Sequence, residues 1–116
     1  MTAPNIVNVA NISAQTALLA TTSSYANLVT NVSGSNSVVK VNVITISNYS
    51  TANFLANVDI YRSSTSYPII GNVLVPANSS LIVSGKDTAF YLQEGDVVRA
   101  STSNSSTAIA SFEVIS

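Results

Sequence analysis

Apolar and polar residues alternate with a period of two along several segments of this chain, and this pattern constrains the fold more than any other feature. Successive side chains of a β-strand point to opposite faces, so the period is that of strands with one buried face. Residues 54–61 and 108–115 show it most clearly. In residues 38–47 the apolar positions shift from odd to even numbers, which predicts a central strand covered on both faces or a bulge that switches the phase.

Shorter apolar segments predict the remaining strands. These segments are residues 6–12, 18–22, 27–32, 69–75, 80–83, 88–92 and 97–101. Turn-forming residues separate the segments at intervals of about 8–12 residues, the spacing typical of a sandwich or barrel. No segment combines a helical stripe with capping signals. We therefore expect an all-β fold, a single-domain antiparallel β-sandwich of Ig-like or jelly-roll-like type with about 8–10 short strands.

The length of 116 residues fits one domain, which we place at residues 6–116. Residues 1–5 form either a frayed end or an arm that docks on a neighbouring subunit by strand addition. If they form an arm, the interface residues are Thr2, Ala3, Pro4, Asn5 and Ile6.

Charged residues make up only 8% of the chain, and the net charge is −1. This composition excludes the basic surface that nucleic acids and anionic membranes require, so neither is an expected partner. The polar surface comes instead from 20 Ser, 13 Asn and 11 Thr. No segment has the 18 or so consecutive apolar residues of a membrane span, and no basic region opens a signal peptide, so we expect use without export.

Enzyme chemistry has few candidates, because the chain contains no His and no Cys. Ser37 and Lys40 match a Ser-x-x-Lys spacing, but on a predicted strand residues three apart point to opposite faces. Asp87, Glu94 and Asp96 are a weak candidate for a calcium site, although their spacing is not that of an EF-hand. We expect no enzyme activity and no cofactor.

Aromatic residues offer one alternative function. Tyr61, Tyr67, Phe90 and Tyr91 would form a stacking platform in a carbohydrate-binding module. Packing within the core and hairpins explains them better, and the absence of Trp also argues against the carbohydrate function.

Several strand and turn segments resemble small virion structural proteins of tailed bacteriophages, especially those of cyanobacteria and marine bacteria. The resembling segments are residues 43–48 (Val-Ile-Thr-Ile-Ser-Asn), 58–62 (Val-Asp-Ile-Tyr-Arg), 75–81, 86–88 and 91–96, together with 16–19 and 26–31. They are spread over most of the chain, from residue 16 to residue 96, but contain no functional motif.

The resemblance implies a β-sandwich on the exterior of a virion, assembled in the cytoplasm of a bacterial host. The expected function is that of a capsid decoration or cement protein, which binds the major capsid protein at capsomer junctions and associates with itself, as a homotrimer. The alternative is a structural module of the tail, neck or fibre.

Overall fold

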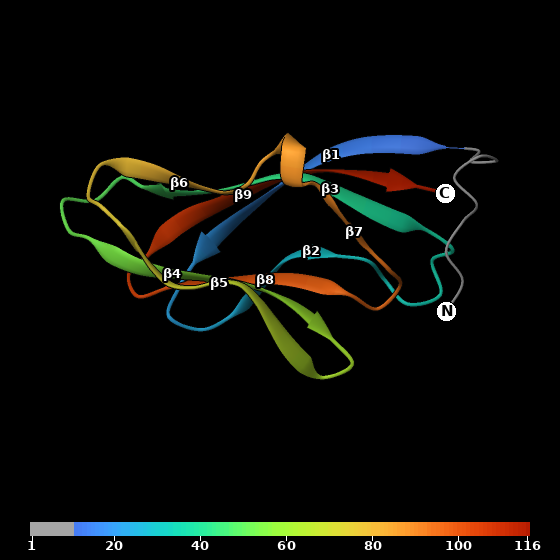
Figure 1. The fold of residues 1–116 in the computed structure, drawn as a ribbon, viewed down its shortest axis with the longest axis horizontal. Coiled ribbons are helices and arrows are strands. Elements are labelled where there is room, and N and C mark those ends of the chain that lie inside the picture. Colours follow the sequence, from blue (N-terminus) through green and yellow to red (C-terminus); the bar gives the residue numbers. More distant parts are fainter. Residues whose placement is uncertain (1–10) are drawn as a thin grey trace.

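The computed structural model describes residues 11–116, except for the side chain of Lys86. The described residues form strands and one short 3-10 turn (Figure 1). In chain order these are β1 (Ile12–Thr21), β2 (Ala26–Thr30), β3 (Val38–Asn48), β4 (Phe54–Arg62), β5 (Thr65–Val75), β6 (Ser79–Ser84), η2 (Lys86–Thr88), β7 (Phe90–Leu92), β8 (Val97–Thr102) and β9 (Ser106–Ile115). No helix in this part of the chain is long and apolar enough to cross a membrane.

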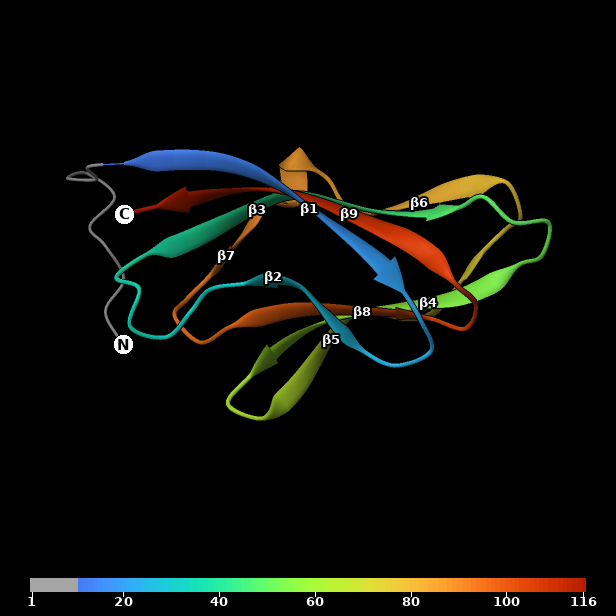
Figure 2. The same cartoon turned by 180° about the vertical axis from the view of Figure 1, so that it is seen from behind.

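The strands form two antiparallel sheets that pack face to face as a sandwich (Figures 1 and 2). Sheet A has the order β1-β9-β3-β6, with β7 also paired to β3, and sheet B has the order β2-β8-β4-β5. Strands from the beginning of the chain pair with strands from its end, as β1 does with β9 and β2 with β8. In the middle of the chain, β4 pairs with its sequence neighbour β5. This nested pairing is that of a jelly roll, which resolves the two expected sandwich types.

The core lies between the two sheets, and small and β-branched residues form most of it, together with Leu28, Phe54 and Leu92. Its fully buried members include Val41, Ile44, Ile46, Ala56, Val58, Val75, Leu92, Val98, Ala100, Ala108 and Ala110. They come from strands of both sheets, so burial of apolar surface holds the sandwich closed.

Strand β3 explains the phase shift in its sequence. It lies inside sheet A between β9 and the pair β6 and β7, which confirms the central position. Its register with β9 shifts between Val41 and Val43, so one extra residue, Asn42, enters the strand. This bulge changes the inward residues from Val39 and Val41 to Ile44 and Ile46.

The strand predictions for residues 54–61 and 108–115 are confirmed by β4 and β9, and those for 69–75 and 97–101 lie within β5 and β8. The start of the strand predicted at residues 18–22 is wrong, because β1 already begins at Ile12 and runs to Thr21. The strand predicted at residues 6–12 lies mostly outside the described residues. Residues 88–92 divide into the end of η2 and the short strand β7.

Candidate functional site

The last residue of β4, Arg62, binds a carboxylate in the turn that precedes β8. Its Nε and Nη2 donate to Oδ1 and Oδ2 of Asp96 at 2.7 and 2.5 Å. The Asp96 side chain is 1% exposed, and it also accepts the Gln93 backbone N–H at 2.8 Å. Burial raises the pKa of Asp96, but the hydrogen bonds from Arg62 and Gln93 and the charge of Arg62 lower it by more. The net pKa lies below its ordinary value.

The three predicted calcium ligands are not brought together. Asp96 is held by Arg62, and Glu94 is buried and accepts the backbone N–H of Asn36 at 3.2 Å. Asp87 lies exposed on η2. Across residues 11–116 no group of three His, Cys, Asp or Glu side chains is arranged to hold a metal ion. This finding corrects the calcium hypothesis, because two of the acids stabilise the loop structure instead.

A second ion pair lies on the outer face of sheet B. Asp59 on β4 is directly opposite Arg99 on β8, and its side chain is fully buried. Arg99 donates from Nε to Oδ1 at 3.0 Å and from Nη2 to Oδ2 at 2.5 Å, and the Ser66 hydroxyl donates to Oδ2. The hydrogen bonds to Asp59 raise the pKa of Arg99. Its guanidinium lies 4.5 Å from the ring centroid of Tyr25 and 4.0 Å from that of Tyr61.

The groups of the Asp59–Arg99 ion pair are occupied by partners within the fold. Both oxygens of Asp59 accept hydrogen bonds, and Arg99 is covered by two rings, so neither group is placed to bind or transfer a proton to a substrate. Through Asp59, Ser66 and Arg99, these contacts connect strands β4 and β5 to β8.

The predicted tyrosine platform is not assembled. Tyr61 lies opposite Ser66, whereas Tyr67 lies opposite Ile60, so the two rings occupy opposite faces of sheet B. Tyr91 is on β7 in the other sheet, and Phe90 packs against the core. The structure therefore has no single surface on which these aromatic residues could together bind a carbohydrate.

Ser37 and Lys40 are placed as the sequence predicts, at the beginning of a strand. Ser37 precedes β3 and donates its hydroxyl to the Ser35 carbonyl at 3.2 Å. Lys40 lies on β3 opposite Glu113 and Tyr91. No bond links serine to lysine, as expected for positions on opposite faces.

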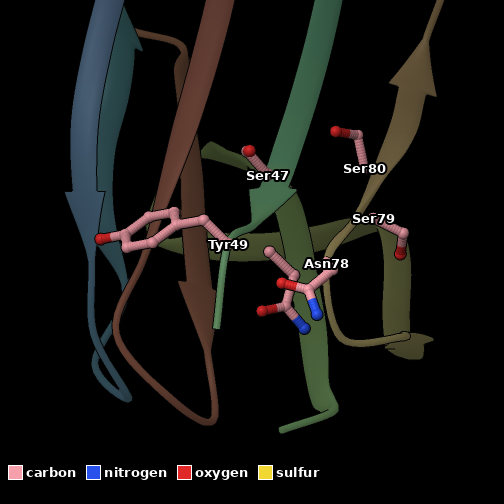
Figure 3. Close-up of a pocket in the computed structure, with 6 residues that line it drawn as sticks. Ser47, Tyr49, Asn78, Ser79 and Ser80 are labelled. Carbon is pink, nitrogen blue, oxygen red and sulfur yellow. The ribbon is translucent and has the colours of Figure 1, made fainter. Parts of the chain in front are cut away.

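A hollow of about 300 Å³ lies where β3 ends and β6 begins (Figure 3). Its lining is neutral and consists of Ser47, Asn48, Tyr49, Asn78, Ser79 and Ser80. Asn48 is structural, because its Nδ2 donates to the carbonyls of Ala52, Val75 and Pro76 at 2.9, 3.0 and 3.1 Å. In Figure 3 the Tyr49 ring points away from Ser79 and Ser80. The hollow thus offers hydroxyl and amide groups but no acid, base or nucleophile activated by one.

The sheet edges differ sharply in how they are protected. On sheet B, β5 carries Pro68 and Gly71 and two register irregularities, and β2 has only five residues and a register shift. On sheet A, β6 has six residues and a register shift. Strand β1 has ten residues in unbroken register with β9 and contains no charged residue, proline or glycine. It therefore lacks the features that prevent edge pairing in natural sheets.

The free backbone groups of β1 follow from its pairing. Asn11 and Ser116 exchange two backbone hydrogen bonds of 2.9 Å. Bonded and non-bonded pairs alternate along an antiparallel ladder, so the odd-numbered residues of β1 bond to β9. The even-numbered residues direct N–H and C=O away from β9, to the side on which no strand of residues 11–116 pairs with β1; they are Ile12, Ala14, Thr16, Leu18 and Ala20. The sequence contained one signal of this edge, because no charged residue precedes Lys40.

The other predicted interface lies outside the described residues. It consists of Thr2, Ala3, Pro4, Asn5 and Ile6. The hypothesis of a docking arm stays a prediction.

These observations define an all-β sandwich with jelly-roll pairing, in which no second strand among residues 11–116 pairs with the outer side of β1. No protein-family model and no curated protein matches the chain. Its fold is similar to that of a solved structure of Bacillus endospore appendages, described as a novel family of disulfide-linked pili, with a TM-score of 0.54. That likeness covers 99% of this chain and 95% of the other at 11% identity, and it shows the fold alone.

Proposed function

We propose that this protein is a non-enzymatic structural subunit that works by non-covalent assembly in many copies. The observation that supports this most strongly is the edge of β1, which is ten residues long and without charge and which, among the described residues, pairs on one side only. Such an edge is a ready site for strand pairing, and soluble proteins that remain monomeric normally block it. Its presence beside the irregular edges β2 and β5 of sheet B fits a chain that is covered by a partner in its working state.

The more specific proposal is a decoration protein on the exterior of a bacteriophage head. The resemblance of residues 43–48, 58–62 and 91–96 to phage virion proteins supports it. The subunit binds the major capsid protein at capsomer junctions and also associates with itself, as a homotrimer, after synthesis in the bacterial cytoplasm. Many weak contacts between subunits and the capsid then give strong overall binding through avidity.

The surface chemistry agrees with this kind of contact. Four of the few charged side chains, Asp59, Arg62, Asp96 and Arg99, are paired with each other. Neutral hydroxyl and amide groups dominate the remaining polar surface. An interface of such groups around a small apolar centre is typical of non-obligate protein contacts.

A second candidate is a subunit of a filament or of a tail, neck or fibre. The fold likeness to the Bacillus pili favours it, since it extends over nearly all of both chains. Those pili are described as disulfide-linked, whereas this chain has no cysteine. A filament of this protein would therefore be held together without disulfide bonds.

Quantitative mass spectrometry of purified phage particles that contain the protein tests the proposal. A decoration protein is expected in numbers comparable to the capsomers of the head, in the order of hundreds of copies. A count of tens or fewer would contradict capsid decoration and favour the tail, neck or fibre. Recovery of the protein in filaments without capsid protein would favour the pilus-like alternative.

A further inference from the structure

The outer face of sheet A carries a row of side chains that runs from one edge of the sheet to the other. Leu18 on β1 is opposite Ile109 on β9, Ile109 is opposite Thr45 on β3, and Thr45 is opposite Ile82 on β6. Leu18 is 73% exposed and Ile82 is 69% exposed. The row therefore ends in an exposed aliphatic residue on each edge strand.

The next row has the same symmetry on the inner face. Leu19 is opposite Ala108, Ala108 is opposite Ile46, and Ile46 is opposite Leu81. Leu19 and Leu81 are both partly buried against the core. The two edge strands thus match at two consecutive positions, with exposed aliphatic residues outside and half-buried leucines inside.

The backbone groups match as well. Leu18 and Ile109 lie opposite each other without exchanging backbone hydrogen bonds. In an antiparallel sheet the N–H and C=O of one residue point to the same side, so each residue forms backbone hydrogen bonds with only one of its two neighbouring strands. Ile109 therefore bonds to Thr45, and Thr45 forms a non-bonded pair with Ile82. The N–H and C=O groups of Leu18 and Ile82 consequently both point outward, away from the sheet.

Strand direction completes the match. Strand β1 is antiparallel to β9, β9 to β3, and β3 to β6, so β1 and β6 run in opposite directions. If a second copy lies beside the first in the same orientation, its β6 meets β1 as an antiparallel strand. Neither strand contains a charged residue that would oppose this contact.

We infer that β1 of one copy pairs with β6 of the next, with Leu18 opposite Ile82, so that sheet A continues from subunit to subunit. The inference rests on the proposed function and names the partner as a second copy of this chain. Pairing of β1 with itself would leave Ile82 and the edge of β6 uncovered, whereas the β1–β6 contact covers both. Such head-to-tail contacts form a ring if the rotation between copies closes, and a helical filament if it does not.

Cysteine cross-linking tests the contact, because the chain has no thiol of its own. In the variant Leu18→Cys with Ile82→Cys, the two thiols of one copy lie three strand spacings apart, about 14 Å. A bis-maleimide shorter than this separation joins them only between copies. We expect a ladder of covalent multimers on denaturing gels. The control variant, Leu18→Cys with Leu74→Cys, moves the second thiol to another exposed edge residue and should give no ladder.

The single variants separate this contact from its alternatives. Neither Leu18→Cys nor Ile82→Cys alone should cross-link, while their mixture should give dimers. Absence of the ladder in the double variant would overturn the inference, and so would dimers of Leu18→Cys alone, which would place β1 against β1. The copy number in particles is measured separately, so an absent ladder with a high copy number would refute the self-contact and leave the proposed function standing.

Light scattering of the purified full chain gives a second, independent readout. The mass of the wild type should rise with concentration, and Leu18→Lys and Ile82→Glu should each remain monomeric. Mixing these two variants should restore association, because Leu18 of the Ile82→Glu copy meets Ile82 of the Leu18→Lys copy as in the wild type. The other contact in the mixture joins lysine to glutamate. A wild type that stays monomeric at all concentrations, or an Ile82→Glu variant that associates normally, would overturn the inference.

Discussion

Replacement of Arg99 by alanine is the sharpest test of the described packing. Arg99 is 20% exposed, and it is the charged partner of Asp59, whose side chain has no exposure. The substitution removes two hydrogen bonds to the carboxylate and two contacts with the rings of Tyr25 and Tyr61. A buried carboxylate is left with the Ser66 hydroxyl as its remaining side-chain partner.

The expected loss follows from these contacts. Removing one partner of a buried ion pair costs about 3–5 kcal/mol, because the other charge stays uncompensated. Each cation–π contact adds about 0.5–1 kcal/mol. Since Ser66 still donates to Asp59, we expect a total of about 4 kcal/mol, a large share of the stability of an ordinary domain. At about 4 °C for each kcal/mol, the Tm should fall by about 15 °C.

Urea unfolding measures this loss through tyrosine fluorescence, since the chain has five Tyr and no Trp. The matched control is Asp59→Leu with Arg99→Met, which removes both charges and should cost less than Arg99→Ala alone. A loss below about 1 kcal/mol for Arg99→Ala is the value of a surface ion pair and would refute the reasoning. A double variant as unstable as the single one would refute it equally.

Two further perturbations test the loop structure. The pKa of Asp96 in the folded protein lies below its ordinary value of 3.8. The ionised carboxylate therefore stabilises the fold at pH values above 3.8. This stabilisation is lost as the pH falls through the lower pKa of the folded state. The urea midpoints of wild type and Arg62→Ala should therefore differ at neutral pH and converge in acid; parallel pH curves would contradict this. Asn48→Ala removes three donated hydrogen bonds and should cost about 2–3 kcal/mol in thermal unfolding, with Ser80→Ala as a near-neutral control. A loss below about 1 kcal/mol would contradict it.

Strands were predictable where one face is buried and the other is not. Residues 54–61 alternate cleanly because β4 packs one face against the core, and β9 behaves in the same way. Residues 13–15 of β1 were missed because all three are exposed, so no burial imposes alternation there. Their strand conformation comes from the ladder with β9, and a contact with a distant strand leaves no local pattern.

The two ion pairs could not be predicted from the sequence, because they depend on which strands are neighbours in the sheets. Asp59 and Arg99 are separated by 40 positions and meet because β4 and β8 are neighbours in sheet B. Similarly, Asp96 was predicted with Glu94 as a metal ligand from spacing alone, whereas its partner Arg62 is 34 positions away. The identity of an edge strand also depends on strand order, so the uncharged N-terminal segment became informative only once β1 was placed at the edge of sheet A.

The distribution of charge links these clusters to assembly. A chain with four basic and five acidic residues has little net charge to keep copies apart, and two of its basic and two of its acidic groups are paired within the fold. The edges β1 and β6 carry none of the charges. Repulsion between copies is therefore weak where the backbone is open, and the approach of a second copy depends little on ionic strength. Hydrogen bonding along the edge and burial of Leu18 and Ile82 then supply the attraction, which suits a subunit that must pack in large numbers without covalent links.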